Sequence, residues 1–161
     1  MTMHADLALR ITRLEANRDI ERLIADLGAA FDGGPSAEAL RPLFAADATF
    51  EIDGYDTLRG ADAIASGVAG NADRGFRWTL HFLVSPRIDL AADGRTASLS
   101  FMLWEAATAV SGRAYWIGGS YAAQVTLDGE RWRFRHLRLS ADLISHYPEG
   151  WHAKPAALDQ A

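Results

Sequence analysis

The sequence has no cysteine among its 161 residues. The chain therefore cannot form a disulfide, use a thiolate nucleophile, or hold zinc or an iron–sulfur cluster through cysteine. It also lacks any apolar run approaching the roughly 20 residues that a membrane-spanning helix needs. These absences exclude cysteine chemistry and predict that the chain does not cross a membrane.

Positive charge is in the minority, and the formal net charge is −5. Nucleic acids and anionic membranes bind cationic surfaces, so we expect neither as a partner. The only closely spaced cations are the three arginines of residues 131–135, which alternate along an expected strand and indicate a solvated face. The first residues lack a basic stretch followed by an apolar core, so we expect no signal peptide and a soluble, cytoplasmic protein.

Several catalytic and cofactor motifs are missing too. The sequence has no Gly-x-Ser-x-Gly elbow, phosphate-binding loop or dinucleotide fingerprint. His4, His146 and His152 lack metal-ligand spacing, so we expect no metal and no organic cofactor. Gly118 and Gly119 lie inside a strand pattern, where glycine indicates a bulge or close packing.

The first third of the chain has the pattern of helices. Apolar residues recur every three or four positions from 7 to 31, which predicts one amphipathic helix or two in sequence. Asp32-Gly33-Gly34-Pro35 ends this pattern, because glycine takes the left-handed cap conformation and proline cannot continue a helix. Ser36 is then the expected N-cap of a short helix over 37–44. A further helix is expected over 61–72.

The rest of the chain has the pattern of strands, with a short one at 49–53. Four longer ones are expected at 77–90, 96–107, 113–127 and 131–145, with turn signals at 92–94 and 127–130. Helices followed by long strands predict an α+β fold, a cone-shaped barrel whose strongly curved antiparallel sheet wraps around the N-terminal helices. The length fits a single domain over 1–161, with a core at about 7–147 and a tail at 148–161.

Two ionisable residues fall in apolar surroundings. Asp32 ends the first helix directly after Phe31 of its apolar stripe, although it would also suit the opening of a turn. His81 lies in mid-strand among bulky apolar residues, where a buried imidazole needs a hydrogen-bond partner. A carboxylate partner would orient the ring and make it a stronger base. Each residue alone also fits a structural role, whereas a catalytic role for both would need them to meet in a dry interior pocket.

Other residues are candidates for the lining of this pocket. By simple alternation His136 and Arg138 share a face with Trp132 and Phe134, where they would support a leaving anion or an oxyanion. Solvated positions near the end of the strand are the alternative. The expected lining also includes three aromatic residues: Phe31, Trp104 and Tyr115.

Three segments carry a resemblance to a known family. They are Ile20-Glu-Arg-Leu23 leading to Asp32, Thr79-Leu-His81, and Ile117-Gly-Gly-Ser-Tyr121 followed by Arg131-Trp-Arg-Phe134. Together they resemble the SnoaL-like group of the nuclear transport factor 2-like superfamily, which includes scytalone dehydratase and hexachlorocyclohexane dehydrochlorinase. The likeness extends over residues 10–147 and implies the fold more strongly than the substrate.

The resemblance implies a lyase of the dehydratase or dehydrohalogenase type. His81 would be its general base and Asp32 the carboxylate that orients it, and a small apolar cyclic molecule would be converted to an alkene without a cofactor. The resemblance also implies a homo-oligomer, dimer or trimer, formed through the outer sheet face. Trp116, Tyr121 or Trp151 would supply the apolar contact.

Other interpretations stay open. A ketosteroid-isomerase-like proton shuttle would use a pocket carboxylate as base and would need a tyrosine and a protonated acid facing the substrate oxygen. An epoxide hydrolase would need an Asp-Arg-Asp cluster, which is not evident. A non-catalytic module that binds small ligands or assists an oligomeric enzyme is favoured if side chains fill the pocket.

Overall fold

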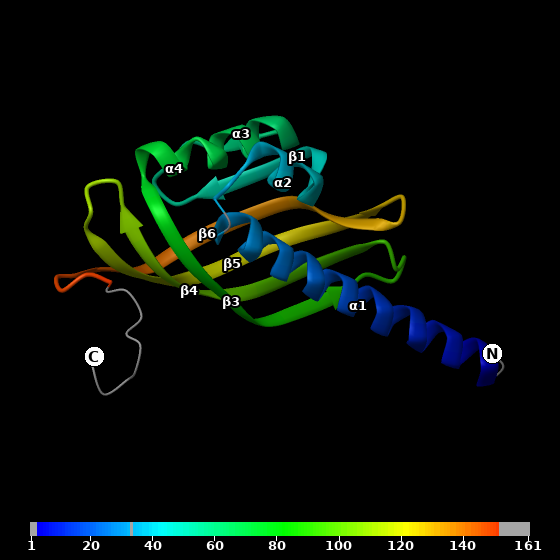
Figure 1. Ribbon diagram of the computed structural model, residues 1–161. Coiled ribbons are helices and arrows are strands. Elements are labelled where there is room, and N and C mark those ends of the chain that lie inside the picture. The colour runs from blue at the N-terminus through cyan, green and yellow to red at the C-terminus, as the bar shows by residue number, and fades with distance from the viewer. Residues whose placement is uncertain (1–2, 33, 152–161) are drawn as a thin grey trace.

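A long N-terminal helix lies across one face of a six-stranded sheet, and shorter helices lie beside the strand β1 (Figure 1). The computed structural model describes residues 3–32 and 34–151. The helices are α1 (Met3–Asp32), α2 (Ala37–Leu40), α3 (Ala61–Ala69) and α4 (Asn71–Arg74), with a 3-10 turn at Arg41–Leu43. The strands are β1 (Phe44–Ile52), β2 (Leu58–Arg59), β3 (Phe76–Leu90), β4 (Thr96–Ala109), β5 (Ala114–Asp128) and β6 (Arg131–Tyr147).

Helix α1 buries one stripe of apolar side chains. Ile20, Leu27 and Phe31 recur on this stripe and are buried in the core. The helix is continuous from Met3 to Asp32, so the alternative of two helices in sequence was wrong. Its first turns extend beyond the sheet (Figure 1), and Leu7 and Leu14 on them are exposed.

The shorter helices form where the sequence predicts them but end earlier. The Ser36 hydroxyl caps α2 by accepting a hydrogen bond from the Ala39 N–H at 3.1 Å. Pro42 lies in the 3-10 turn that ends the expected helix 37–44. The expected helix 61–72 is divided at Gly70 into α3 and α4.

The sheet has the strand order β2-β1-β6-β5-β4-β3. All neighbouring strands are antiparallel except β1 and β6, which are parallel. The predicted α+β class is confirmed. The sheet is curved, but it stays open between its edge strands β2 and β3 and does not close into a barrel.

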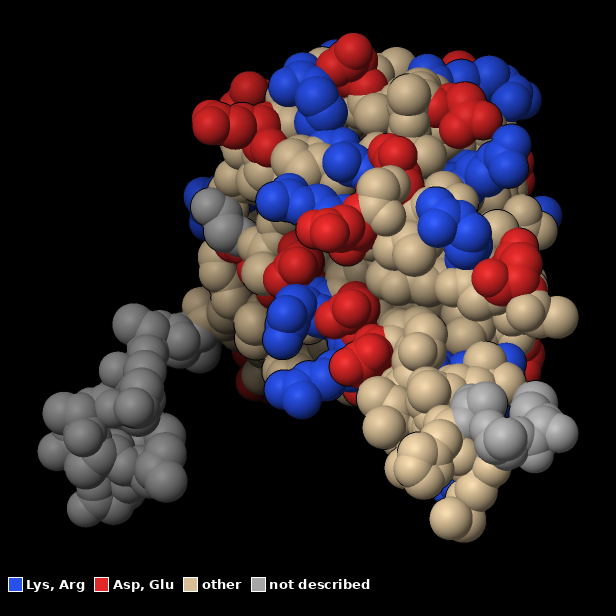
Figure 2. Space-filling model, turned by 90° about the vertical axis from the view of Figure 1, so that its right-hand side faces the viewer, with Lys and Arg blue, Asp and Glu red and all other residues tan. Residues whose placement is uncertain are grey.

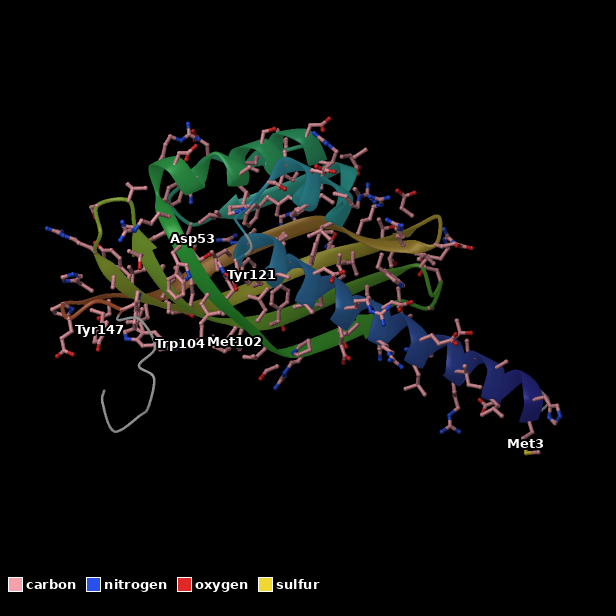
Figure 3. The ribbon with its side chains drawn as sticks, in the orientation of Figure 1. Met3, Asp53, Met102, Trp104, Tyr121 and Tyr147 are labelled. Carbon is pink, nitrogen blue, oxygen red and sulfur yellow. The ribbon has the colours of Figure 1, made fainter. Side chains whose placement is uncertain are left out.

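Side-chain alternation assigns each residue of β4 to one of two faces. Phe101 and Leu103 point to the inner face, toward α1, and are buried. Met102 and Trp104 point to the outer face, where 48% and 42% of their surfaces are exposed. Figure 3 shows the same division, with Tyr121 on the α1 side of the sheet and Met102 and Trp104 on the opposite side.

A β-bulge reverses the alternation along β6. Val125 pairs with Phe134, but the preceding residue, Gln124, pairs with His136, so Arg135 has no counterpart on β5. The extra residue moves the side chains that follow it on β6 to the opposite face, up to the second register shift. A second register shift lies at Gly118 and Gly119, as the glycines predict.

The outer face carries an apolar surface that spans four strands. Phe82 pairs with Trp104, Trp104 with Gly118 and Gly118 with Leu143, which makes one row across the sheet. The next row along the strands begins with the pair Val84 and Met102. We call these rows, with their exposed neighbours, the outer apolar surface. Its members are Trp78, Leu80, Phe82, Val84, Met102, Trp104 and Leu143, each more than 40% exposed.

Charged residues of both signs are interspersed on the end of the molecule seen in Figure 2. Arg135 pairs with Asp47 at 3.3 Å, and Arg41 pairs with Asp62.

None of the helices within residues 3–32 and 34–151 combines the length and the apolarity needed to cross a membrane.

The start of the tail packs against the sheet. The Trp151 indole donates a hydrogen bond to the Ala107 carbonyl oxygen at 3.1 Å and lies edge-on to the Trp116 ring. The tail beyond Trp151, including His152, lies outside the described residues.

Candidate active site

The C-terminal end of α1 is tied to the edge strand β3 through Asp32. The Oδ2 atom of Asp32 accepts the backbone N–H of His81 at 2.8 Å, and Oδ1 accepts the Thr79 hydroxyl at 3.1 Å. An edge strand leaves alternate N–H groups without a partner in the sheet, so a carboxylate at this position satisfies one of them. The helix end thereby fixes the Asp32 carboxylate beside the His81 ring.

The same carboxylate holds the imidazole. Nδ1 of His81 lies 2.6 Å from Oδ1 of Asp32, within the range of a charge-assisted hydrogen bond. The side chains are 9% and 23% exposed, respectively, so water screens the contact only weakly. With Nδ1 donating to Asp32, the lone pair of the neutral ring is on Nε2. The structure brings the two predicted residues together.

A second carboxyl group faces the other side of the ring. Nε2 of His81 lies 3.4 Å from Oε2 of Glu105, which is opposite His81 in the β3–β4 register. Glu105 is 6% exposed, and no other charged residue among those described is buried. His81 therefore lies between two acids, one on α1 and one on β4.

Sequence reasoning missed Glu105, although a signal was present. Strand β4 alternates, and its inner positions carry Leu103, Glu105 and Ala107 in succession. An ionisable residue at an inward position is the anomaly that marks a candidate site. The register that brings it opposite His81 was not readable from either strand alone.

Burial raises the pKa of two side chains on the inner face of the sheet, Glu105 and Tyr121. Loss of solvent raises the pKa of Glu105, His81 opposes this shift, and Asp32 adds to it. Burial also raises the pKa of Tyr121 well above its usual range, and the nearby Glu105 carboxylate adds to the shift. Both shifts favour the protonated form, so both groups are potential proton or hydrogen-bond donors.

Two of the predicted aromatic residues lie on the inner face. The Phe31 ring is 5.0 Å from the His81 ring and packs against the dyad. Tyr115 is half-buried next to Phe76 and His146. That these two residues contact a ligand stays a prediction.

The other three predicted lining residues are on the wrong face. Trp104 stacks on Trp116 on the outer side of the sheet, because it is one position away from the inward Glu105. A hydrogen bond of 2.7 Å joins Nδ1 of His136 to the Thr49 hydroxyl. The Arg138 guanidinium forms an ion pair with Asp53 at 3.1 Å. The bulge at Arg135 breaks the simple alternation that placed these two residues beside Phe134.

The oligomer contact predicted for Tyr121 was also wrong. Tyr121 is 2% exposed and stacks on Phe101 in the core, with ring centroids 4.9 Å apart. Trp116 does point to the outer face, as expected.

The hollow that reaches the dyad is a groove of about 260 Å³ between α1 and β3. Small residues on α1 leave this space, including Gly28, whose neighbour across the groove is Leu83. The groove is open to solvent and lies beside the core that packs α1 against the sheet. An open groove thus takes the place of the closed, dry chamber expected from the sequence. It is lined by Ile24, Ala25, Gly28, Ala29 and Asp32 of α1 and by residues 81–84 of β3.

Asp32, His81 and Glu105 are of residue types that bind metals. In the part of the chain that the structure describes, however, no three such side chains are placed to hold an ion. An imidazole held between two carboxyl groups has the chemistry to exchange a proton with a neighbouring molecule or acid.

Comparison with known proteins supports a family assignment. The profile of the SnoaL-like domain matches residues 12–138. No curated protein matches the chain in sequence. Solved structures that are similar include a type 2 hexachlorocyclohexane dehydrochlorinase, with a TM-score of 0.81 and 18% identity over 92% of this chain and 99% of that one.

Two proteins from Novosphingobium aromaticivorans are also similar. One is a candidate scytalone dehydratase, with a TM-score of 0.77 and 22% identity over 90% of this chain and 93% of that one. The other is an NTF2-like protein with a cystatin-like fold, with a TM-score of 0.76 and 26% identity over 88% and 92% of the two chains. The TM-scores establish a shared fold with these structures, but identities this low do not extend the likeness to a shared reaction.

Proposed function

The chain belongs to the SnoaL-like domain family, and we propose that within this family it is a cofactor-independent lyase. In this proposal Nε2 of His81 removes a proton from a small apolar cyclic molecule, and Asp32 orients and stabilises the imidazolium that forms. The departing group leaves from the adjacent carbon, which gives an alkene. Similar structures include proteins named as a dehydrochlorinase and as a candidate dehydratase.

The contact that carries the proposal is the 2.6 Å hydrogen bond between Asp32 Oδ1 and His81 Nδ1. A structural histidine would need only one partner, but here the carboxylate also binds the His81 backbone N–H and the Thr79 hydroxyl. These bonds fix both the position and the rotation of the ring. Pre-positioning of a base in this way is what general-base catalysis requires.

The direct test is a screen for elimination. Small cyclic alcohols, halides and ketones are incubated with the full chain, and the conjugated product is detected by new ultraviolet absorbance. The proposal predicts at least one substrate whose turnover is lost in His81→Ala. Full turnover by that variant would refute the assignment of the base.

A proton-shuttle isomerase is the second candidate. It would use two neutral acids to bind an enolate oxygen, and Glu105 and Tyr121 are buried acids whose pKa values are raised on the same face. The products separate the two candidates, because isomerisation conserves the mass of the substrate and elimination lowers it. Mass spectrometry of the reaction mixture makes this distinction.

We also propose that the outer apolar surface mediates self-association. Its exposed side chains form contiguous rows across β3, β4 and β6, and exposed patches of this kind mark interaction sites. A second copy of the chain is the partner implied by the family resemblance, as a dimer or a trimer.

A further inference from the structure

The first turns of α1 project beyond the sheet (Figure 1). We call residues 3–15 of this helix the arm. Every side chain described in the arm is exposed, and burial along α1 begins at Ala16. Leu9 precedes Ala16 by seven residues, or about two turns, so it continues the core stripe of α1 onto the arm. The other apolar residues of the arm point elsewhere.

These residues form a second apolar stripe on the opposite side of the helix. Ile11 precedes the buried Ile20 by nine residues, or about two and a half turns, so the two side chains point in opposite directions. Leu7 and Leu14 lie on the same side as Ile11, one turn before it and one turn after it. Leu7, Ile11 and Leu14 are 55%, 46% and 68% exposed. This stripe, which we call the arm seam, faces away from the chain's own sheet.

The spacing of the arm seam is that of a coiled coil. In the seven-residue repeat abcdefg of a coiled coil, apolar residues at a and d make the contact between helices. With Ile11 at a, both Leu7 and Leu14 are at d. A β-branched residue at a with leucine at d favours two parallel strands. Arg18 takes the next a position, where two copies would bring like charges together, so the seam ends before it.

The charges beside the seam are complementary in the same parallel arrangement. Residues at g in one helix form ion pairs with residues at e in its partner, and Arg10 is at g while Glu15 is at e. Five positions apart, the two residues do not face each other within one helix. Neither takes part in an ion pair of the described chain. An antiparallel pair would place g beside g and would not bring Arg10 to Glu15.

We propose that the arm seam is an interaction surface for a second copy of this chain, which it binds as a parallel, in-register pair of helices. The arm belongs to the helix on the inner face of the sheet, so this surface is separate from the outer apolar surface. The rest of α1 is packed in the core, so the arm does not have to nucleate its own helix. The contact is small, and the pair therefore forms at high concentration and dissociates in dilute solution.

The absence of cysteine allows a direct test by disulfide trapping. Leu7→Cys and Leu14→Cys each place one thiol on the seam, and the full chains are equilibrated at high concentration with reduced and oxidised glutathione. Each variant should form a dimer linked between like positions. Leu9→Cys, at a position 52% exposed on the other side of the arm, is the matched control and should give at least about tenfold less dimer. Equal yields at Leu9 and on the seam would overturn the proposal.

A mixture of two variants tests the direction of the helices. Leu7→Cys labelled with nitrogen-15 is combined with unlabelled Leu14→Cys, and the dimers are identified by mass spectrometry. Parallel, in-register pairing brings like positions together, so dimers between two labelled or two unlabelled chains should predominate. Mixed dimers at or above the proportion expected from random pairing would overturn the parallel arrangement.

Charge exchange tests the contact between Arg10 and Glu15. In the Leu14→Cys chain, Arg10→Glu or Glu15→Arg places like charges together and should lower the dimer yield by about tenfold. The chain with both changes should recover the yield, because the charges are then exchanged but still opposite. Circular dichroism checks that each variant keeps its helix. A double variant that is no better than the single ones would overturn the assigned contact.

A last comparison separates the arm seam from the outer apolar surface. Trp104→Arg places a charge on the outer surface and should leave the Leu14→Cys dimer in place. Loss of that dimer in Trp104→Arg would mean that the outer apolar surface brings the copies together, and would overturn the seam as an independent interface.

Discussion

Nδ1 of His81 lies 2.6 Å from Oδ1 of Asp32, and this contact joins the last residue of the first helix to an edge strand that is far away in sequence. The other oxygen of the same carboxylate binds the His81 backbone. One acidic side chain thus fixes both the main chain and the ring of the histidine, so the geometry of the base depends on how α1 ends. The catalytic proposals follow from this arrangement.

Replacing either member of the dyad should separate catalysis from folding. His81→Ala should lower elimination by about 10²–10⁴-fold, because a positioned general base contributes about this much. Asp32→Asn should lower turnover as well, because an amide does not stabilise the imidazolium. Asp53→Asn, which alters an exposed pair with Arg138, is the matched control. Initial rates and circular dichroism provide the measurements, and a His81→Ala variant with native turnover would contradict the account.

Glu105 should make stability depend on pH. Burial raises its pKa above the ordinary 4.5, so the folded chain holds this proton more tightly than the unfolded chain does. Its contribution to stability is fully present below about pH 4.5 and is lost as pH rises through the raised pKa. The charged groups that act on it are Asp32 and His81, and the Tyr121 hydroxyl lies nearby.

The variant Glu105→Gln isolates this effect. Relative to it, the free energy of unfolding of the native chain should fall by up to about 1.4 kcal/mol for each pH unit between the ordinary and the raised pKa of Glu105, and should then level off. Urea unfolding of both chains from about pH 4 to about pH 9 measures the difference. A constant difference across this range would mean that Glu105 is not held protonated by burial.

Filling the groove should block access without altering the dyad. Ala29 lines the groove on α1 and is exposed, so Ala29→Phe adds bulk there and removes no core contact. We expect kcat/KM to fall by at least about tenfold while the melting temperature changes little. Ala8→Phe, on the exposed first turns of α1, is the control. Unchanged kcat/KM in Ala29→Phe would show that substrate enters elsewhere.

A charge on the outer apolar surface should disrupt self-association. Trp104→Arg places a cation in the centre of the row that links Phe82 to Leu143. The predicted result is a shift from oligomer to monomer in sedimentation velocity, because a buried unpaired charge is costly. Gln124→Arg, on the same face outside the rows, should leave the oligomer intact. A native chain that sediments as a monomer would contradict the proposed interface.

A methyl group at Gly119 should destabilise the bulge beside β6. Its Cβ would overlap the carbonyl oxygen of Ser140, which is backbone and cannot rotate away. We expect Gly119→Ala to cost about 1–3 kcal/mol in urea unfolding. Gly28→Ala is the contrast, because its Cβ would meet Leu83 at an ordinary 3.5 Å and lies within a helix. It should be neutral or stabilising by up to about 1 kcal/mol.

The sequence pattern predicted the order of the elements, and the family resemblance implied the meeting of Asp32 with His81. Helical periodicity ends at Asp32, and the next long apolar strand carries His81, so a helix packed on that strand brings the two close. The end of the helical periodicity and the apolar strand pattern are each read within one short segment. An error of one or two residues in where an element begins or ends does not change either prediction.

Strand register could not be predicted in the same way. Arg135 enters a bulge that exchanges the two faces of β6, and this moves His136 and Arg138 to the outside. Glu105 was overlooked because its importance depends on pairing with His81 across two strands. The open groove depends on how α1 sits against β3, which no single segment specifies.

The most direct test of the central claim is hydrogen exchange at carbon. Cyclohexanone is incubated with the full chain in heavy water, and loss of the proton next to the carbonyl group is followed by nuclear magnetic resonance. This reaction needs the base but no leaving group. The account predicts exchange above background with the native chain, slower exchange with Asp32→Asn and background exchange with His81→Ala. Equal exchange by the native chain and His81→Ala would contradict the assignment of His81 as the base.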